Sequence, residues 1–567
     1  MTSDPRTAGA SRSASASPVP TSSSDAPPTS ASAPSDDVLE VDVIVLGGGP
    51  VGENVAQYAI EGTGLTAAIV EGERMGGECS YWACMPSKAL LRPLDVRAAA
   101  AHLPGITTPE IDVEELLARR DDWVSHYDDT GQVQWAEGAG LTVVRGHGTL
   151  SGEHEVTVRP ADGAGADGAG ADGATAGDVA PQVLRARRAV VLATGSEPVI
   201  PAPYRELAPW TSRDATGVKE VPWRLLIVGG GVVACEAATW MRALGSEVTM
   251  LVRGERLLPS AEPEASEHVR TGLEEIGVRV ITGASAQHAT RDVVSQDAAE
   301  ESGIGRVHGG EVRVHVAGTA GTGTAGTGTA GAGAQDGGAR GGNGGEEDGD
   351  FTADEILVAT GRRPRLQDVG LETVGLSPDD VTGGALPDWL RAVGDASGEA
   401  PLTHWGKYRA RVIGEDIRDA ALADVEPTPP PEPVAQGRAV PQVVFTDPQV
   451  ASVGLTESAA RDAGFDVVVA QVPFEGSAGS ALLRDDASGV AKIVVDAVTR
   501  RLLGATFAGP DAAEIVHAAT VAIVGEIPVD VLRHAVPSYP TASELWLRLL
   551  EELPREYRHA APQGRRE

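Results

Sequence analysis

The sequence predicts an α/β protein with two doubly wound, Rossmann-like domains and an α+β domain towards its C-terminal end. Two apolar runs, residues 39–46 and 225–228, each stop at a cluster of glycines that precedes a helix-like segment. Such runs are typical of buried parallel strands. After residue 437, strand-like segments such as 442–445 alternate with helical stretches such as 512–524, which predicts the α+β domain.

Composition narrows the class of protein. A chain of 567 residues has room for about three or four domains. The 46 basic and 81 acidic side chains give a net charge of −35, which argues against nucleic acid as a partner. Three cysteines cannot form a secreted disulfide framework, and no apolar run approaches the roughly 18 residues of a membrane span. We therefore expect a cytoplasmic protein that does not contact a membrane.

Several segments have the composition of linkers or tails. Residues 1–38 are rich in Ser, Ala and Pro and lack the apolar stretch of a signal peptide, so we expect a disordered tail. Tracts at about 161–177 and 318–350 are too poor in apolar residues to fold, and each follows a strand-like segment. We expect both to be disordered insertions in hairpins. A proline-rich linker is predicted at 425–436, and a second tail at 555–567.

The first glycine cluster has the spacing of a dinucleotide site. Gly47 permits a tight turn, Gly49 lets the backbone approach a pyrophosphate, and Gly52 lets the following helix pack against the strand. Glu71 ends the next predicted strand, where a carboxylate can bind an adenosine ribose. A bare turn is the alternative.

A second glycine cluster repeats the pattern with Gly229, Gly231 and Ala234. The following strand ends without an acidic residue and is succeeded by Arg253 and Arg256. Arginines bind a 2′-phosphate that an acid would repel, so the sequence favours NADPH over NADH. Ordinary solvated arginines are the alternative, and use of NADH stays open.

Cys79 and Cys84 are two of the three cysteines, and they open an apolar, helix-like run. Four intervening residues can be looped to bring the two sulfurs together, and no second pair exists for a structural zinc site, so we predict no metal. A thiolate near a helix N-terminus has a lowered pKa, which suits a redox-active pair. Two small apolar core residues are the alternative. Two nucleotide sites and one dithiol form an electron path from a nicotinamide through a flavin to the cysteines.

With these motifs in order, the chain from about residue 39 to 553 resembles the pyridine nucleotide-disulphide oxidoreductases, which include lipoamide dehydrogenase, glutathione reductase and mercuric reductase. The resemblance implies FAD as cofactor and a redox-active disulfide bond. It implies that Cys84 lies against the flavin, that Cys79 attacks the substrate, and that Lys88 pairs with Glu236 near the flavin.

Three further motifs carry the resemblance. Thr194 and Gly195 match the first domain crossover, and the segment that ends in Gly361 and an arginine matches the return crossover. Gly394 and Asp395 match the second flavin motif, in which the aspartate holds the ribityl chain. Residues 440–448 resemble the start of a dimerisation domain, which implies a homodimer.

The resemblance also divides the chain into domains. We expect an FAD-binding domain in two parts, an NAD(P)H-binding domain between them and a C-terminal dimerisation domain. Their predicted ranges are 39–203 and 362–424 for FAD, 204–361 for NAD(P)H and 437–554 for dimerisation.

One departure from the family bears on catalysis. Tyr539 stands where the family has a histidine, and Glu544 is the acid that would orient that histidine. A histidine has a pKa near 6.5 and can exchange a proton with a thiol at neutral pH, whereas a tyrosine, near 10, is almost fully protonated. Loss of a general acid/base typically costs about 10² to 10⁴ in rate. His534 could substitute only through a shift of the chain.

Two further departures concern the substrate. Val232 replaces the tyrosine that gates the nicotinamide pocket of the glutathione reductase branch, so we expect the gate to be open or closed differently. Cys235 is expected to be a core residue. No cysteine follows it, which argues against mercuric reductase and large thioredoxin reductase activities.

Three functions follow as hypotheses. The first is an FAD-dependent, NADPH-preferring oxidoreductase that passes electrons through Cys79 and Cys84 to a disulfide acceptor. The second is direct transfer from the flavin to a quinone, suggested by Tyr539. The third is a non-enzymatic flavoprotein that acts as a redox sensor or binding subunit.

Overall fold

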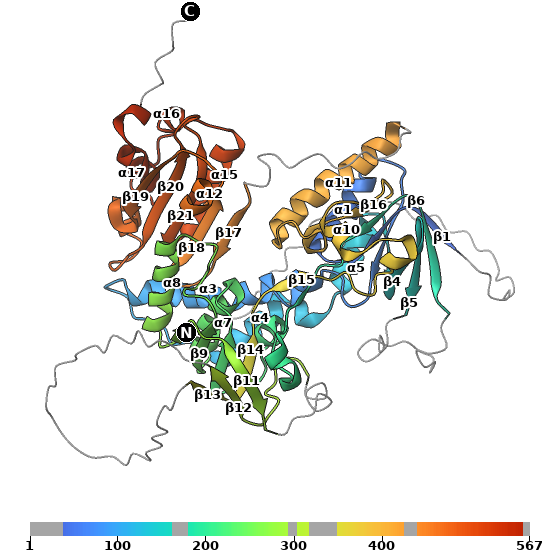
Figure 1. Cartoon of the computed structure of the whole chain (residues 1–567), viewed down its shortest axis with the longest axis horizontal. Helices are drawn as coiled ribbons and strands as arrows, with labels where there is room; N and C mark the ends of the chain where they lie inside the picture. Colours follow the sequence, from blue (N-terminus) through green and yellow to red (C-terminus); the bar gives the residue numbers. More distant parts are fainter. Residues whose placement is uncertain (1–37, 161–179, 293–302, 317–348, 424–438, 559–567) are drawn as a thin grey trace, which may run out of the picture. The chain divides into compact units, whose positions relative to one another are not determined.

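The computed structural model describes residues 38–160, 180–292, 303–316, 349–423 and 439–558. The tail predicted at 1–38 lies outside these residues except for Val38, and the predicted linker at 425–436 lies wholly outside them. So do most of the two predicted insertions. The predicted fold class is confirmed. Two sheets with parallel strands and one antiparallel C-terminal sheet each have helices packed against them (Figure 1).

The first sheet is mostly parallel and contains the first glycine cluster. Its strand order is β3-β2-β1-β6-β5-β4, with β16 paired to β6. Helices α1 (Pro50–Ile60) and α11 (Thr403–Ala423) pack on it with an apolar core between them. The strands are β1 (Leu39–Leu46), β2 (Ala67–Glu71), β3 (Leu141–Arg145), β4 (His147–Gly152), β5 (Glu155–Arg159), β6 (Gln182–Leu192) and β16 (Leu390–Ala392).

Other helices of this part follow the β2 strand or precede β16. They are α2 (Gly77–Tyr81), α3 (Cys84–Ala101), α4 (Val113–Trp123), α5 (Thr130–Gly138) and α10 (Pro378–Thr382). The short helix α2 and the long helix α3 matter most for function, because they carry the two cysteines of the redox motif.

The second sheet is parallel, in the order β10-β9-β8-β14, and contains the second glycine cluster. It consists of β8 (Arg224–Val228), β9 (Glu247–Val252), β10 (Arg279–Thr282) and β14 (Glu355–Val358), with helices α6 (Ser212–Thr216), α7 (Val232–Ala243) and α8 (Pro263–Glu275). A three-stranded antiparallel sheet covers it with β11 (Ala286–Arg291), β12 (Val312–Val316) and β13 (Asp350–Ala353). A two-stranded pair, β7 (Ser196–Pro198) and β15 (Arg362–Pro364), forms the crossover.

The strands that flank the two predicted insertions pair as hairpins require. β5 pairs antiparallel with β6, and β12 pairs antiparallel with β13. The glycine-rich tracts therefore connect adjacent strands, and Asp350, predicted to end the second tract, is already the first residue of β13.

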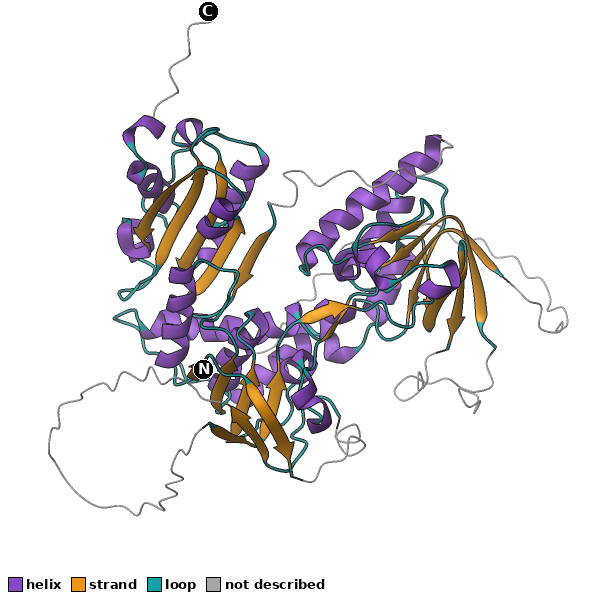
Figure 2. Cartoon of the chain, in the orientation of Figure 1, coloured by secondary structure: helices purple, strands orange, loops and turns teal. Residues whose placement is uncertain are grey.

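The C-terminal part is an antiparallel five-stranded sheet packed against helices (Figure 2). Its order is β17-β18-β21-β20-β19, formed by β17 (Pro441–Val444), β18 (Gln449–Gly454), β19 (Val467–Pro473), β20 (Val490–Asp496) and β21 (Leu502–Gly509). The helices are α12 (Glu457–Asp462), α13 (Ala478–Ala481), α14 (Ala512–Ile515), α15 (His517–Val524), α16 (Val529–Leu532) and α17 (Glu544–Glu552).

Two details differ from the sequence-based expectation. The helical stretch predicted at 512–524 is divided into α14 and α15 at Val516. The predicted tail from residue 555 begins with a 3₁₀ turn, Arg555–Tyr557, because Tyr557 packs against the C-terminal core. Among the described residues, no helix combines the length and the apolar character that crossing a bilayer requires.

Candidate functional site

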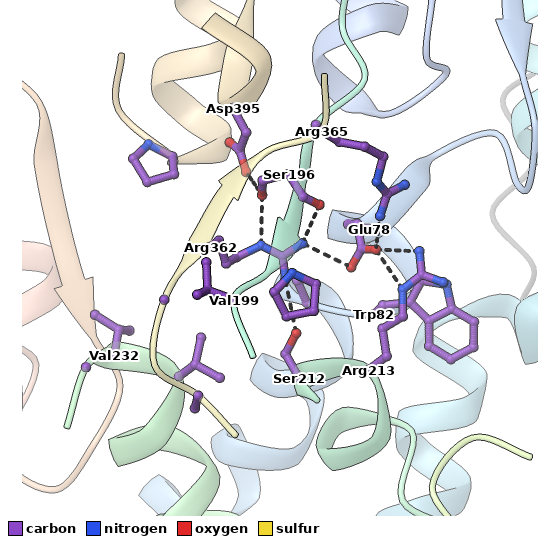
Figure 3. Close-up of a pocket in the computed structure, with 18 of the residues that line it drawn as sticks. Glu78, Trp82, Ser196, Val199, Ser212, Arg213, Val232, Arg362, Arg365 and Asp395 are labelled. Atoms are coloured by element: carbon purple, nitrogen blue, oxygen red, sulfur yellow. Dashed lines mark hydrogen bonds and ion pairs between the residues drawn. The ribbon is translucent and has the colours of Figure 1, made fainter. Parts of the chain in front are cut away.

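A cavity of about 1340 Å³ brings the sequence-predicted motifs together. Both glycine turns, both cysteines of the redox motif and the predicted lysine–glutamate pair line it. Figure 3 shows part of its wall. Of the predicted site residues, those that do not line it are Gly52, Ala234, Tyr539 and Glu544.

The first glycine turn is built for close backbone approach. Gly47 has a φ of +107°, and a Cβ on it would lie 2.3 Å from the carbonyl oxygen of Ala193. A Cβ on Gly52 would lie 1.9 Å from the carbonyl oxygen of Gly47. Gly49 is the N-cap of α1 and supplies no side-chain cap, so the first amides of this helix face the turn. Such a helix N-terminus is suited to binding a phosphate.

Glu71 closes the same turn from the end of β2. Its carboxylate accepts hydrogen bonds from the amides of Gly48 and Glu73, each at 2.7 Å. Burial raises the pKa of Glu71, and these hydrogen bonds oppose the increase. The carboxylate is therefore fixed at the cavity wall, where the sequence predicted a ribose ligand.

The second glycine turn repeats this geometry in the other parallel sheet. Gly229 has a φ of +133°, and a Cβ on it would lie 2.3 Å from the carbonyl oxygen of Ala359. Gly231 is the N-cap of α7, again with no side-chain cap, and no atom lies within 4 Å of the Cβ position. Ala234 is fully buried in the first turn of this helix. This turn can also hold a pyrophosphate.

The two arginines after β9 lie at the cavity wall beside this second turn. Arg253 is exposed, and Arg256 is half-buried and donates to the carbonyl oxygen of Pro259 at 2.8 Å. The two sequence-predicted arginines therefore line the same cavity as the second glycine turn.

The two crossover motifs lie next to each other. The hydroxyl of Thr194 donates to the carbonyl oxygen of Arg365 at 2.6 Å, and β7 pairs with β15. Gly195 and Gly361 have φ values of +73° and +133°, which only glycine adopts easily. Both crossover segments therefore line the cavity between the two glycine turns.

Asp395 projects into the cavity from the turn after β16, where Gly394 has a φ of +68°. The hydroxyl of Ser196 donates to the Asp395 carboxylate at 2.5 Å, and the Arg362 guanidinium donates to the Ser196 hydroxyl at 2.8 Å (Figure 3). Neither Ser196 nor Arg362 was predicted as a site residue from the sequence.

Three arginines gather round Glu78, the residue before Cys79. The Arg213 guanidinium donates to the Glu78 carboxylate at 2.7 Å, and those of Arg362 and Arg365 lie 3.9 and 3.8 Å away (Figure 3). The arginines come from α6 and the return crossover, so this cluster has no local signature in the sequence. It joins the redox segment to both crossovers.

Cys79 lies in α2, and Cys84 is the first residue of α3. Both are free thiols and half-buried. The hydroxyl of Thr403, the first residue of α11, lies 3.4 Å from each of the two sulfurs. Thr403 is a further site residue that was not predicted from the sequence, because it is 319 residues away from Cys84.

The environments of the two thiols differ. The hydrogen bond from Cys79 lowers the pKa of Cys84 to about 6, helped by Thr403 and the positive charge of Lys88 and opposed by burial. The same hydrogen bond and burial raise the pKa of Cys79, whereas Thr403 and the positive charge of Lys407 lower it. Cys84 is therefore the thiolate of the pair, consistent with its place at a helix N-terminus.

This difference predicts a titration. In the protein reduced with dithiothreitol, ultraviolet thiolate absorbance should appear with a midpoint near pH 6 as the pH rises, because the Cys84 thiol loses its proton there. Cys84→Ser should lack this step. A first thiolate that forms only near the usual value for cysteine, about 8.5, would contradict the assignment.

Lys88 and Glu236 form the predicted pair. The Lys88 ammonium lies 2.7 Å from the Glu236 carboxylate, whose other oxygen accepts from the amide of Phe445 at 3.0 Å. Glu236 is 3% exposed. The Lys88 ammonium also lies 4.9 Å from the centre of the Phe445 ring. The pair thus fixes a positive charge beside Cys84.

Tyr539 and Glu544 lie outside this cavity. Tyr539 is 78% exposed, and the neighbouring His534 is also exposed. The buried Glu544 carboxylate accepts from the amide of Gly479 at 3.1 Å, so it has a backbone partner in place of the imidazole expected in the family. A Cβ on Gly479 would lie 2.0 Å from the carbonyl carbon of Thr541, which shows how tightly this segment packs.

Comparisons with known proteins find matches over most of the chain. The family model described as pyridine nucleotide-disulphide oxidoreductase matches residues 41–385, and the model of that family's dimerisation domain matches residues 440–549.

Several curated relatives span almost the whole chain. A dihydrolipoyl dehydrogenase of Thermus scotoductus is 31% identical, over 91% of this chain and 98% of the relative. A mercuric reductase of Staphylococcus aureus is 26% identical, over 89% of this chain and 81% of the relative.

Solved structures share the fold. The flavoprotein disulfide reductase RclA from Escherichia coli, in its Cu(II) complex, matches with a TM-score of 0.68 and 21% identity, covering 90% of this chain and 99% of the other. LpdA from Mycobacterium tuberculosis matches with a TM-score of 0.67 and 21% identity, covering 91% and 99%.

Proposed function

Because the chain belongs to the pyridine nucleotide-disulphide oxidoreductase family and is an NAD(P)H-dependent flavoprotein enzyme acting on sulfur groups, we propose that it passes electrons from NADPH through FAD to Cys79 and Cys84 and on to a small disulfide. One observation carries the proposal. The two thiols share the hydroxyl of Thr403 in a cavity that both glycine turns also line.

The residues present fit FAD. The uncapped N-terminus of α1, the glycine turn before it and the fixed carboxylate of Glu71 match a pyrophosphate and an adenosine ribose. Asp395, held by Ser196, is the acceptor proposed for the ribityl hydroxyls. When bound, FAD supplies the redox centre that accepts hydride from a nicotinamide and reduces a disulfide.

The second glycine turn is proposed to hold the nicotinamide nucleotide, and Arg253 and Arg256 are proposed to favour NADPH. Both arginines line the cavity, and β9 ends without an acidic residue that would repel a 2′-phosphate. Val232, in the first turn of α7, also lines the cavity, and its short side chain is proposed to leave the nicotinamide pocket open.

Replacing both arginines by alanine should raise the KM for NADPH by about 10- to 100-fold, because hydrogen bonds to a charged group contribute about 1.5–3 kcal/mol. The KM for NADH should change little. Arg270→Ala, on the exposed face of α8, is a control that should affect neither. Equal increases with both nucleotides would contradict the assignment.

The two thiols are proposed to divide the exchange reaction. The Cys79 sulfur attacks one sulfur of the substrate disulfide, a mixed disulfide forms, and the first product thiolate leaves. The Cys84 thiolate then attacks the Cys79 sulfur and releases the second product. Two electrons reduce the substrate to two thiols, and the enzyme dithiol becomes the Cys79–Cys84 disulfide. The two product thiolates take up the Cys79 proton and one proton from solvent.

The dimerisation domain implies a homodimer. Within the described residues, this domain exposes several large apolar side chains, including Leu482 (68%), Val536 (87%) and Tyr539 (78%). Leu482 lies close to the segment of Tyr539, because Leu482 and Pro540 line one small pocket, and contiguous exposed apolar surface is typical of a face that a partner covers. We propose that Tyr539 lies on the surface that a second subunit covers, so that it can approach the dithiol of that subunit.

Cys79→Ser tests the proposed electron path. With NADPH as donor, this variant should lose turnover with disulfides such as lipoamide and glutathione disulfide to the level of the uncatalysed reaction, because the attacking thiol is missing and Cys84 alone cannot form the disulfide through which electrons reach the substrate. Flavin content should be unchanged, and NADPH should still reduce the flavin. An intact disulfide rate in the variant would refute the proposal.

Turnover with a quinone distinguishes the proposed disulfide reduction from direct transfer of electrons from the flavin to the acceptor. The replacement of the histidine by Tyr539 is the observation that favours the second function. Quinone turnover that survives in Cys79→Ser, with no disulfide turnover in the wild-type protein, would establish it instead.

A further inference from the structure

The short helix α6 contacts the segment that carries the two cysteines at both of its ends. We call residues 78–84 the redox loop. It consists of most of α2 and a two-residue break before α3, where Ala83 has the non-helical dihedral angles φ −136° and ψ −93°. A disulfide between Cys79 and Cys84 would close across this break, with its two sulfurs about 2.0 Å apart. How firmly the loop is held therefore affects how readily the bond forms.

Arg213 of α6 anchors the Cys79 end of the redox loop. Its Nε donates to the Glu78 carboxylate at 2.7 Å, and its two terminal nitrogens donate to the two oxygens of Glu73 at 3.0 and 2.9 Å (Figure 3). The guanidinium carbon also lies 5.5 Å from the centre of the Trp82 ring. A planar fork with partners on three nitrogens has one favoured orientation, so Arg213 fixes the residue before Cys79.

Thr216 of α6 anchors the other end of the redox loop. Thr216 is 2% exposed, and its hydroxyl donates to the carbonyl oxygen of Trp82 at 3.0 Å, two residues before Cys84. Trp82 is 6% exposed and stacks on Tyr127, with ring centres 4.6 Å apart. The residue at the break between α2 and α3 is therefore held by its backbone and by its ring.

Helix α6 is itself held in place. It has five residues, which is too few for an isolated helix to be stable. A capping box formed by Thr211 and Asp214 closes its N-terminus. At its other end, the Arg120 guanidinium of α4, which is 1% exposed, donates to the carbonyl oxygen of Thr216 and, at 2.9 Å, to that of Val218. A fixed helix thus contacts both ends of the redox loop.

We infer that α6 is a clamp on the redox loop, with Arg213 as its main positioning residue, and that the clamp favours closure of the Cys79–Cys84 disulfide. This inference rests on the proposed function. Without the clamp, the loop would gain conformational freedom as a dithiol but little as a disulfide, because the S–S bond already restrains it. The clamp therefore makes the dithiol a stronger reductant of an acceptor disulfide.

The test is the thiol–disulfide equilibrium of the FAD-loaded protein in anaerobic mixtures of reduced and oxidised dithiothreitol. Two electrons pass from reduced dithiothreitol to the Cys79–Cys84 disulfide; of the two protons released, Cys79 takes one and solvent the other, since Cys84 stays a thiolate at neutral pH. Acid quenching, alkylation in denaturant and peptide mass spectrometry measure the dithiol fraction. Arg213→Met should shift the equilibrium constant about 10-fold towards the dithiol, which raises the midpoint potential by about 30 mV.

Arg213→Lys separates position from charge. Lysine keeps the positive charge but not the fork of donors, so the constant should shift in the same direction by more than about threefold. If Arg213 acted only through its charge, Arg213→Lys would be unchanged, and Arg213→Met would shift towards the disulfide, because losing a cation disfavours the Cys84 thiolate. That result would overturn the inference. Arg119→Met is the matched control, because it removes an arginine 5.4 Å from the ring of Trp123, which is 50% exposed and outside the loop. It should leave the constant unchanged.

Thr216→Val tests the clamp at its other end. It keeps the shape of the side chain, removes the hydroxyl that contacts Trp82, and should shift the constant towards the dithiol by about threefold. This variant decides the matter if the Arg213 variants do not retain flavin. Unchanged constants in the Arg213 variants, or in Thr216→Val where those lose flavin, would overturn the inference alone. A wild-type protein that forms no Cys79–Cys84 disulfide in any mixture would refute the proposed function and the inference with it.

Discussion

Replacing Tyr539 by histidine is expected to accelerate disulfide reduction at neutral pH by about 10²- to 10⁴-fold, the usual contribution of a general acid/base. An imidazole, with a pKa near 6.5, can take the proton from a thiol and return it to the leaving thiolate, which a phenol cannot do at this pH. Glu544 is already buried and held by the amide of Gly479, so a carboxylate is fixed five residues from the new histidine. Steady-state kinetics with NADPH and a panel of disulfides measures the gain.

Tyr539→Phe is the matched control, since it keeps the ring and removes the hydroxyl. We expect it to change disulfide turnover by less than about threefold if the tyrosine takes no part in proton transfer. If Tyr539→His is no faster than the wild-type protein, position 539 does not limit the reaction, and the account of this departure from the family is wrong.

Replacing Lys492 by methionine is expected to lower the free energy of unfolding by about 3–5 kcal/mol, because it leaves the buried Glu262 carboxylate without its counter-charge. The Lys492 ammonium lies 3.0 Å from the carboxylates of Glu262 and Glu457 and 3.5 Å from that of Glu264. Lys492 and Glu262 are 4% and 2% exposed. The network joins α8 to the C-terminal sheet, so urea unfolding should show a lower midpoint.

Glu264→Gln is the control for this network. Glu264 has a side chain that is 40% exposed, so its removal should cost less than about 1 kcal/mol. Equal losses in the two variants, or no loss in Lys492→Met, would show that the buried lysine does not hold these elements together.

The fold was predictable because its signals are local. The apolar runs at β1 and β8 end at glycines whose positive φ values the strand-to-helix turns require, and these patterns can be read in any short window. The two cysteines were recognised in the same way, from their spacing and the helix that follows Cys84.

The rest of the site depends on contacts across long stretches of chain. Thr403 meets both sulfurs from 319 residues beyond Cys84, and no pattern round Thr403 indicates this. The arginines round Glu78 come from elements more than a hundred residues away. Glu544 shows the same limit, because the sequence showed only that it lacks the family's histidine partner, and its contact with the amide of Gly479 depends on packing.

Anaerobic titration of the FAD-loaded protein with NADPH tests the central claim most directly, namely that electrons reach the Cys79–Cys84 pair. The first equivalent of NADPH should produce a long-wavelength absorbance band, from the Cys84 thiolate beside the flavin. In Cys79→Ser, which cannot form the disulfide, the band should be present before NADPH is added and should be lost as NADPH reduces the flavin; in Cys84→Ser it should be absent. A wild-type protein that is reduced without this band, or a Cys84→Ser variant that keeps it, would contradict the account.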